Sequence, residues 1–184
     1  MEPNPERRCA VAAVRAACLL AESVRTRRDA AAALVKDDRS PVTVADFAVQ
    51  ALVTLLLEES LPGFRLVAEE EGDDLDRDDR AGVRDAVVSA VRAHLPRTPD
   101  QVLEALRRGR HAGGPEGDFW TLDPIDGTKG FLRDGQYAVA LARIVDGRPV
   151  LAVLGCPNLP HGERRGCVFV AERGRGAVVF GVDD

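Results

Sequence analysis

Apolar residues recur at helical spacing in much of the first half of the chain. This spacing predicts helices over residues 8–25, 43–61 and 81–94, and a shorter helix over 100–108. Pro62-Gly63 ends the second of these helices, because proline and glycine both disfavour a continued helix.

The remaining apolar residues fall in short runs bounded by turn residues, mostly in the second half of the chain. These runs predict strands over residues 64–68, 119–122, 137–145, 149–156, 168–172 and 177–180. The pair Asp146-Gly147 between two of them is a strong hairpin signal. Helices first and antiparallel strands later predict an α+β domain, with layered helices on a mainly antiparallel sheet.

Two aspartates follow the strand predicted over residues 119–122. Asp123 and Asp126 are separated by Pro124 and Ile125. Pro124 fixes its own φ and has no N–H, so it favours a turn over a continued ladder. This geometry aims both carboxylates at one point beyond the sheet edge.

Gly127 and Thr128 continue the predicted turn. Glycine lets the backbone approach a ligand closely, and threonine adds a hydroxyl beside free N–H groups. Oxygen ligands at a strand end, followed by an anion-binding turn, suit a divalent cation and a phosphate together. The alternative is a plain loop, since Asp-Pro and Asp-Gly are ordinary turn formers, but the full run is longer than a turn requires.

The run Asp123-Pro-Ile-Asp-Gly-Thr128 resembles the signature of the lithium-sensitive, magnesium-dependent phosphatases related to inositol monophosphatase. Its continuation Lys129-Gly-Phe-Leu-Arg133 looks like the eukaryotic-type 3′(2′),5′-bisphosphate nucleotidases, as do Gln136-Tyr-Ala-Val-Ala-Leu141 and Gly155-Cys-Pro-Asn-Leu-Pro160. The resemblance runs from about Arg39 to Phe180. It implies the N-terminal half of the inositol monophosphatase and fructose-1,6-bisphosphatase-like sugar phosphatase fold.

Asp46 lies near the start of the helix predicted over residues 43–61. Its spacing from Thr43 is that of a capping box, so one interpretation is a helix cap. The resemblance implies another, in which Asp46 pairs with Thr128 and the two jointly activate a water. A carboxylate turned inward cannot also serve the helix end fully, so the two roles coexist only in part.

A second acidic segment follows the strand predicted over residues 64–68. The resemblance makes Glu69, at the carboxyl end of this strand, a metal ligand. Glu70 is expected to point away by the alternation of an extended chain, although the family often places this second acid near the metals too. Residues 73–79 are expected to form a solvated acidic loop.

The resemblance implies a metal site with four ligating groups: Glu69, Asp123, the carbonyl of Ile125, and Asp126. Two carboxylates about 4 Å apart repel by roughly 4 kcal/mol at an effective dielectric near 20, so gathering these acids is costly without cations. Ligands that are all oxygen favour Mg²⁺ or Mn²⁺, and we expect Mg²⁺ as the cofactor. The residues predicted to bind the substrate phosphate are Asp126, Gly127 and Thr128.

Composition and charge narrow the class of protein. The 184 residues can bury one substantial core, and the 45% hydrophobic and 30% charged residues are typical of a globular protein. The net charge of −5 offers no basic patch for a nucleic-acid polymer.

Without a membrane-length apolar run or a signal-peptide core, we expect a cytoplasmic protein, or an organellar one, with no membrane partner. The four cysteines are expected to be buried, reduced thiols, with a disulfide as the alternative.

The resemblance implies an enzyme that removes the 3′-phosphate of adenosine 3′,5′-bisphosphate by attack of a metal-activated water. The 5′-phosphosulfate form of that nucleotide is a second candidate substrate. One alternative is another enzyme of the family, an inositol monophosphatase or an inositol polyphosphate 1-phosphatase. The other is a catalytically deficient member that binds metal or a protein partner.

Relatives in this family carry a second α/β domain after the matched part. We therefore expect residues 1–184 to form a single N-terminal metal-binding phosphatase domain without that C-terminal domain. Such a domain leaves an apolar face uncovered, with residues 138–154 as its source, and we expect self-association through it. The expected ligand is a small phosphorylated nucleotide.

Overall fold

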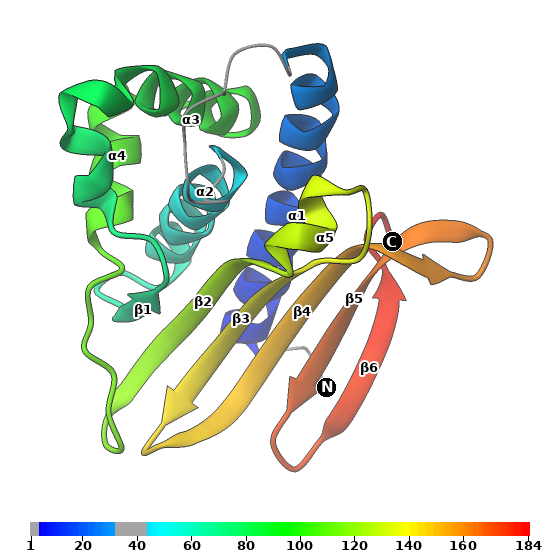
Figure 1. The fold of residues 1–184 in the computed structure, drawn as a ribbon. Helices are drawn as coiled ribbons and strands as arrows, with labels where there is room; N and C mark the ends of the chain where they lie inside the picture. The colour runs from blue at the N-terminus through cyan, green and yellow to red at the C-terminus, as the bar shows by residue number, and fades with distance from the viewer. Residues whose placement is uncertain (1–3, 32–43) are drawn as a thin grey trace.

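The computed structural model describes residues 4–31 and 44–184, within which five α-helices accompany one six-stranded sheet (Figure 1). The helices are α1 (Pro5–Ala31), α2 (Val44–Ser60), α3 (Ala81–His94), α4 (Pro99–Arg107) and α5 (Thr128–Leu132). The strands are β1 (Leu66–Ala68), β2 (Asp118–Asp126), β3 (Ala138–Val145), β4 (Arg148–His161), β5 (Arg164–Glu172) and β6 (Gly176–Gly181). The α+β class predicted from the sequence is confirmed.

The strands lie in the sheet in their order along the chain, from β1 to β6. Every neighbouring pair from β2 to β6 is antiparallel, whereas β1 is parallel to β2. The last residue of β1, Ala68, is aligned with Leu122 of β2. The carboxyl end of β1 therefore meets β2 at the point where the chain continues into Asp123.

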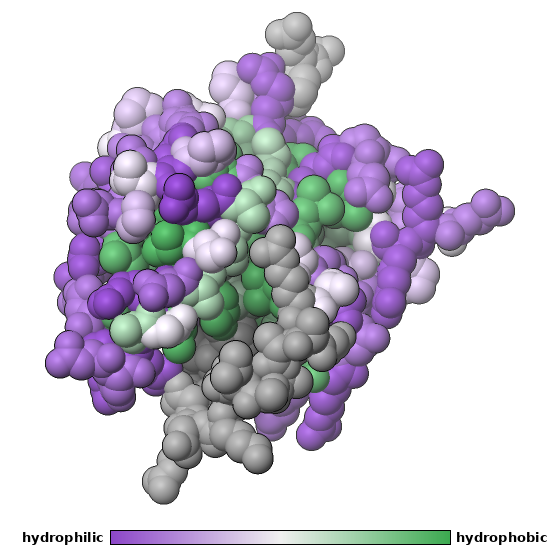
Figure 2. Space-filling view, turned by 90° about the horizontal axis from the view of Figure 1, so that it is seen from above, coloured by the Kyte–Doolittle hydropathy of each residue, from purple (hydrophilic) through white to green (hydrophobic). Residues whose placement is uncertain are grey.

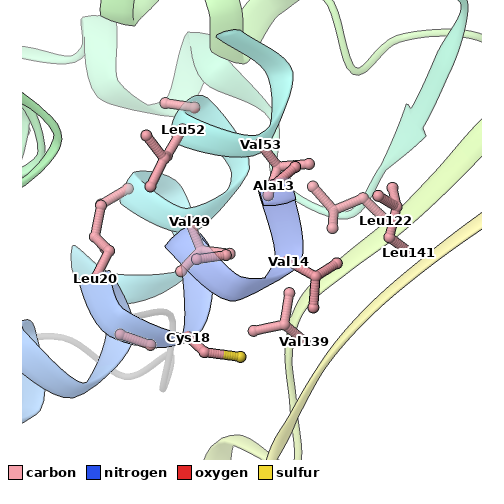
Figure 3. Packing of buried hydrophobic residues seen from close by; sticks show 14 of the residues in the cluster. Ala13, Val14, Cys18, Leu20, Val49, Leu52, Val53, Leu122, Val139 and Leu141 are labelled. Atoms are coloured by element: carbon pink, nitrogen blue, oxygen red, sulfur yellow. The ribbon is translucent and has the colours of Figure 1, made fainter. Parts of the chain in front are cut away.

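The hydrophobic core lies between one face of the sheet and helices α1 and α2 (Figure 3). Val14 and Cys18 of α1 point toward Val139 of β3 in this layer. A Cβ added to Gly155 of β4 would lie 2.4 Å from Cys18 Sγ and 2.7 Å from Val14 Cγ1, so glycine is needed for the helix to approach this closely. Seen from above, hydrophobic residues are visible in the middle of the molecule inside a rim of hydrophilic ones (Figure 2).

Two further expectations concern the cysteines and membranes. The cysteines are all buried, as predicted. Of the helices in the part of the chain that the structure describes, none is both long and apolar enough to span a membrane.

Two local predictions need correction, and one short helix was missed. Strand β2 does not end before Pro124 but continues to Asp126 through an irregularity between Asp123 and Asp126. Proline is tolerated there because the register shift interrupts the ladder. Residues 73–79 are not a plain solvated loop, because they form parts of two short 3-10 helices, Gly72–Asp76 and Asp78–Arg80. Leu75 anchors the first of these helices in the core. The short helix α5 was not predicted, because five residues carry too little periodicity.

The second face of the sheet carries two rows of mostly apolar side chains, which together we call the open face. The first row, in register from β2 to β6, is Asp123, Ala140, Leu154, Phe169 and Val179. The neighbouring row is Thr121, Ala142, Ala152, Ala171 and Ala177. Helices α1 to α4 lie on the opposite side of the sheet (Figure 1), and the side chains of Leu154 and Val179 are 37% and 44% exposed.

We predict that the chain self-associates through the open face, because exposed apolar patches of roughly several hundred Å² favour association. Leu154→Lys places a charge in the middle of this face and should lower the apparent mass in light scattering and the binding of a hydrophobic dye. Leu19→Lys is the matched control, since Leu19 is an exposed leucine on α1. A strictly monomeric wild-type chain that binds no dye would contradict the prediction, as would an equal effect of both variants.

Candidate functional site

The parallel pairing of β1 with β2 brings Glu69 beside Asp123. Each residue directly follows one member of the aligned pair Ala68 and Leu122. Burial, the negative charges of Glu69 and Asp126, and a side-chain contact with Glu69 raise the pKa of Asp123 from 3.8 to about 6. The predicted metal ligands Glu69 and Asp126 therefore lie near Asp123, and the negative charges of these three side chains repel one another.

Glu70 lies in the same group of acids, as the family resemblance allows, and does not point away as the alternation of an extended chain predicts. Burial, and then the charges of Asp46 and Glu69 among others, raise the pKa of Glu70 from 4.5 to about 7. Strand β1 ends at Ala68, and residues 69 and 70 form a bend, so the alternation of an extended chain does not apply to them. Asp46 is 4% exposed in the first turn of α2.

Gln50 of α2 fixes the backbone of Glu70. The Glu70 N–H donates to Gln50 Oε1 at 3.0 Å, and Gln50 Nε2 donates to the Glu70 carbonyl at 2.8 Å. The Gln50 side chain is fully buried, so this double hydrogen bond ties the segment after β1 to the helix that carries Asp46. No local sequence pattern marks Gln50, and its role was not predicted.

We call the five acids Asp46, Glu69, Glu70, Asp123 and Asp126 the carboxylate cluster. One of its oxygens, Asp123 Oδ1, is buried and has no hydrogen-bond partner among the residues that the structure describes. Burying an unpaired carboxylate oxygen is costly, and a hard divalent cation is the ligand that such oxygens accept. The donor chemistry thus fits Mg²⁺. The side chains do not form a complete set of metal ligands. Within residues 4–31 and 44–184, no three His, Cys, Asp or Glu side chains are grouped so that they could hold a metal ion.

The turn after β2 has the backbone that the sequence predicts. Gly127 has φ +90°, a left-handed conformation that favours glycine, and the N–H of Gly130 donates to its carbonyl at 2.7 Å. The Thr128 hydroxyl donates to the carbonyl of Ile125 at 3.3 Å. A predicted catalytic hydroxyl and a predicted ligating carbonyl are therefore hydrogen-bonded to each other.

The roles assigned to Asp46 remain predictions. Its pairing with Thr128 and its function in catalysis rest on the family resemblance. The capping box with Thr43 lies outside the described residues.

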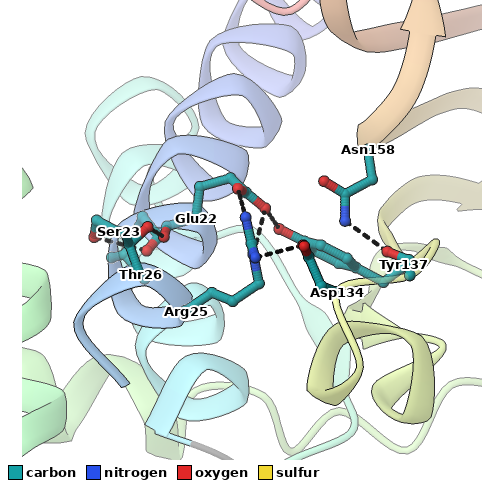
Figure 4. Close-up of polar contacts among 9 residues, drawn as sticks. Glu22, Ser23, Arg25, Thr26, Asp134, Tyr137 and Asn158 are labelled. Atoms are coloured by element: carbon teal, nitrogen blue, oxygen red, sulfur yellow. Dashed lines mark hydrogen bonds and ion pairs between the residues drawn. The ribbon is translucent and has the colours of Figure 1, made fainter. Parts of the chain in front are cut away.

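A polar network beside this turn was missed by the sequence reasoning. It joins Glu22 and Arg25 of α1 to Asp134 and Tyr137, which follow α5 (Figure 4). Glu22 and Tyr137 are 115 residues apart in the chain, so no local motif could reveal the contact.

Comparison with known proteins defines the class of protein. Residues 2–183 match the inositol monophosphatase family, and the chain belongs to that family. The family is metal-dependent. The family resemblance predicted from Asp123-Pro-Ile-Asp-Gly-Thr128 is thereby confirmed.

Curated relatives of the chain include 3′(2′),5′-bisphosphate nucleotidases. The chain is 40% identical over 174 residues to a 3′(2′),5′-bisphosphate nucleotidase of Schizosaccharomyces pombe, which covers 88% of this chain and 49% of the relative. It is 43% identical over 164 residues to 3′(2′),5′-bisphosphate nucleotidase 1 of Arabidopsis thaliana, which covers 77% and 46%. The chain thus spans about half the length of these curated relatives.

Solved structures share the fold. CysQ from Bacteroides thetaiotaomicron, a bacterial member of the inositol monophosphatase family, superimposes with a TM-score of 0.55 at 21% identity, over 95% of this chain and 48% of that one. Mycobacterium tuberculosis SuhB gives a TM-score of 0.53 at 20% identity, over 94% and 46%. The architecture described above is therefore the one found in about half of each of these chains.

We predict that the metal-free protein loses stability as the pH rises from about 4 to about 7. The pKa values of Asp123 and Glu70 are raised to about 6 and about 7 in the folded chain, above their unfolded values near 4. Their contribution to the free energy of unfolding is present below the unfolded pKa and is lost as pH rises through the folded pKa.

Chemical denaturation in chelator at several pH values measures this loss. Asp123→Asn should weaken the pH dependence, because it removes one titrating acid and relieves its neighbours, and Mg²⁺ should weaken it in the wild type. An identical pH dependence in the two proteins would show that the cluster does not produce it.

Proposed function

We propose that the chain is the metal-binding part of a Mg²⁺-dependent phosphatase of the 3′(2′),5′-bisphosphate nucleotidase type. Its reaction is removal of the 3′-phosphate of adenosine 3′,5′-bisphosphate, with the 5′-phosphosulfate form as a second candidate substrate. The observation that carries the proposal is the carboxylate cluster beside the Gly127 turn, in a chain about 40% identical to such nucleotidases. In this function residues 1–184 form one cytoplasmic domain that acts on a small nucleotide.

The proposed ligands are Glu69, Asp123, Asp126 and the carbonyl of Ile125. A bound Mg²⁺ supplies positive charge that favours ionisation of a water and offsets the charge of the phosphate. The Asp46 carboxylate would take the proton of the attacking water through the Thr128 hydroxyl, which accepts that proton and passes on its own, and the amides of Gly127 and Thr128 would orient the phosphate. Glu70 supports the cluster, since its backbone is held by Gln50 and its side chain lies near Asp46.

A second candidate function is metal or partner binding without turnover. The uncovered apolar rows of the open face are consistent with it.

Phosphate release decides between these functions. The 184-residue chain is incubated with adenosine 3′,5′-bisphosphate or with inositol 1-phosphate, each with Mg²⁺ or with chelator. Mg²⁺-dependent release that favours the nucleotide supports the proposal. Preference for the inositol ester would overturn the nucleotidase type, and Mg²⁺ binding without release from either substrate would favour the second candidate.

We predict that Asp126→Asn lowers the affinity for Mg²⁺ by roughly tenfold or more, since loss even of an outer-shell partner has about that effect. The fold should persist, because Asn-Gly is itself a good turn former, and the metal-free variant should be at least as stable as the wild type. Magnesium titrations and thermal melts with and without chelator measure both effects.

Asp146→Asn is the matched control for this variant. Asp146-Gly147 is also an Asp-Gly turn, but it joins β3 to β4 away from the cluster, and Asn can still accept the hydrogen bond from the Gly117 N–H. Equal Mg²⁺-dependent stabilisation of Asp126→Asn and Asp146→Asn would remove Asp126 from the ligand set.

A further inference from the structure

The turn at Gly127 rests directly on the backbone of the segment that follows α5. A Cβ on Gly130 would lie 1.8 Å from the carbonyl oxygen of Gln136, and one on Gly127 would lie 3.3 Å from the same oxygen. The N–H of Gly135 donates to the carbonyl of Gly130 at 2.8 Å. With no side chain between the two backbones, the position of residues 134–137 fixes the position of the turn.

Helix α1 holds this segment through the side chains of Glu22 and Arg25. The Tyr137 hydroxyl donates to Glu22 Oε1 at 2.6 Å. Arg25 donates to Glu22 Oε2 at 2.6 Å and to Asp134 Oδ1 at 2.5 Å, so one guanidinium joins the helix to the start of the segment (Figure 4). We call Glu22, Arg25, Asp134 and Tyr137 the brace.

Tyr137 connects the brace to α5. Its ring meets the ring of Phe131 edge to face, with centroids 5.1 Å apart. Phe131 is 1% exposed in α5, the helix that begins at Thr128. Tyr137 therefore contacts α5 through its ring and α1 through its hydroxyl.

Asn158 of β4 holds the segment from the other side. Its Nδ2 donates to the Gly135 carbonyl at 2.5 Å, and Gln136 Nε2 donates to the Asn158 carbonyl at 3.0 Å. The Asn158 side chain is 2% exposed. Buried polar groups bonded on several sides rigidify a segment, and here the rigid segment is the support of the turn.

The charges in the brace favour its formation at neutral pH. Burial alone would raise the pKa of Glu22, but the hydrogen bonds from Arg25 and Tyr137 outweigh it and lower the pKa. Burial and the contact with Glu22 raise the pKa of Tyr137, which keeps the phenol protonated as a donor. Hydrogen bonds to an ionised acceptor are stronger than those between neutral groups.

We propose that Glu22 is a positioning residue for the phosphate-binding turn, acting through Tyr137 and Arg25 to set the place of Gly127 and Thr128 beside the carboxylate cluster. The assignment of a phosphate monoester as the ligand of this turn rests on the proposed function. The mechanical link from α1 to the turn does not, because it consists of contacts within the chain.

Tyr137→Phe tests the link with the least disturbance, since it keeps the ring against Phe131 and removes only the hydroxyl. Glu22→Gln is the conservative companion: it keeps an acceptor for Tyr137 and loses the charge that pairs with Arg25. Arg7→Gln is the matched control, because it removes another ion pair of α1, that of Arg7 with Glu172 of β5 at 3.2 Å, which contacts neither the segment nor the turn.

Hydrogen exchange of the amides in residues 128–135 is the first measurement. We expect exchange there to quicken roughly tenfold or more in Tyr137→Phe, given the strength of a hydrogen bond to a charged group, with a smaller change in Glu22→Gln. Exchange in α3 should be unchanged in both, and Arg7→Gln should leave residues 128–135 unaffected. Phosphate release from adenosine 3′,5′-bisphosphate should show a raised KM in Tyr137→Phe with its Mg²⁺ dependence retained.

Unchanged exchange at residues 128–135 in Tyr137→Phe, or acceleration equal to that in Arg7→Gln or spread over the whole chain, would overturn the positioning role. An unchanged KM in a variant that shows local acceleration would also overturn it. A wild-type chain without turnover would count against the proposed function instead, and the exchange comparison alone would then decide the role of Glu22.

Discussion

The parallel pairing of β1 with β2 is the constraint on which the rest of the candidate site depends. Because β1 runs parallel to β2 and ends at Ala68, opposite Leu122, Glu69 and Asp123 follow aligned residues and lie side by side although they are far apart in sequence. Two such carboxylates repel by roughly 4 kcal/mol when about 4 Å apart at an effective dielectric near 20. The fold thus holds together charges that would separate in an unconstrained chain, and burial together with the charges of Glu69 and Asp126 raises the pKa of Asp123.

Contacts remote in sequence hold the surroundings of this pair in place. Gln50 binds both backbone groups of Glu70 and keeps it in the carboxylate cluster. On the other side of the cluster, the brace and Asn158 fix the segment against which the Gly127 turn packs. The cluster supplies negative oxygens and the turn supplies N–H groups, a combination suited to a cation and a phosphate bound together.

The sequence predicted the fold well wherever a local pattern determines local structure. The helix over residues 81–94 was predicted at its observed bounds, and the Asp146-Gly147 turn joins two paired strands as expected. Asp123 and Asp126 were predicted as site residues because they occupy one short motif. For Glu70, alternation predicted the wrong direction because a bend, fixed by a helix elsewhere in the chain, replaces the strand there, whereas the family resemblance allowed the observed position. Glu22 was not found at all, since its importance comes only from tertiary contacts.

The central claim is that the carboxylate cluster is a cation site created by the β1–β2 edge. The most direct measurement is anomalous X-ray diffraction from crystals of the chain soaked in Mn²⁺, a cation that accepts the same oxygen ligands as Mg²⁺. The account predicts an anomalous peak between the carboxylates of Glu69, Asp123 and Asp126, with Asp123 Oδ1 among the coordinating atoms. Strong peaks elsewhere on the molecule, with none at this edge, would contradict it.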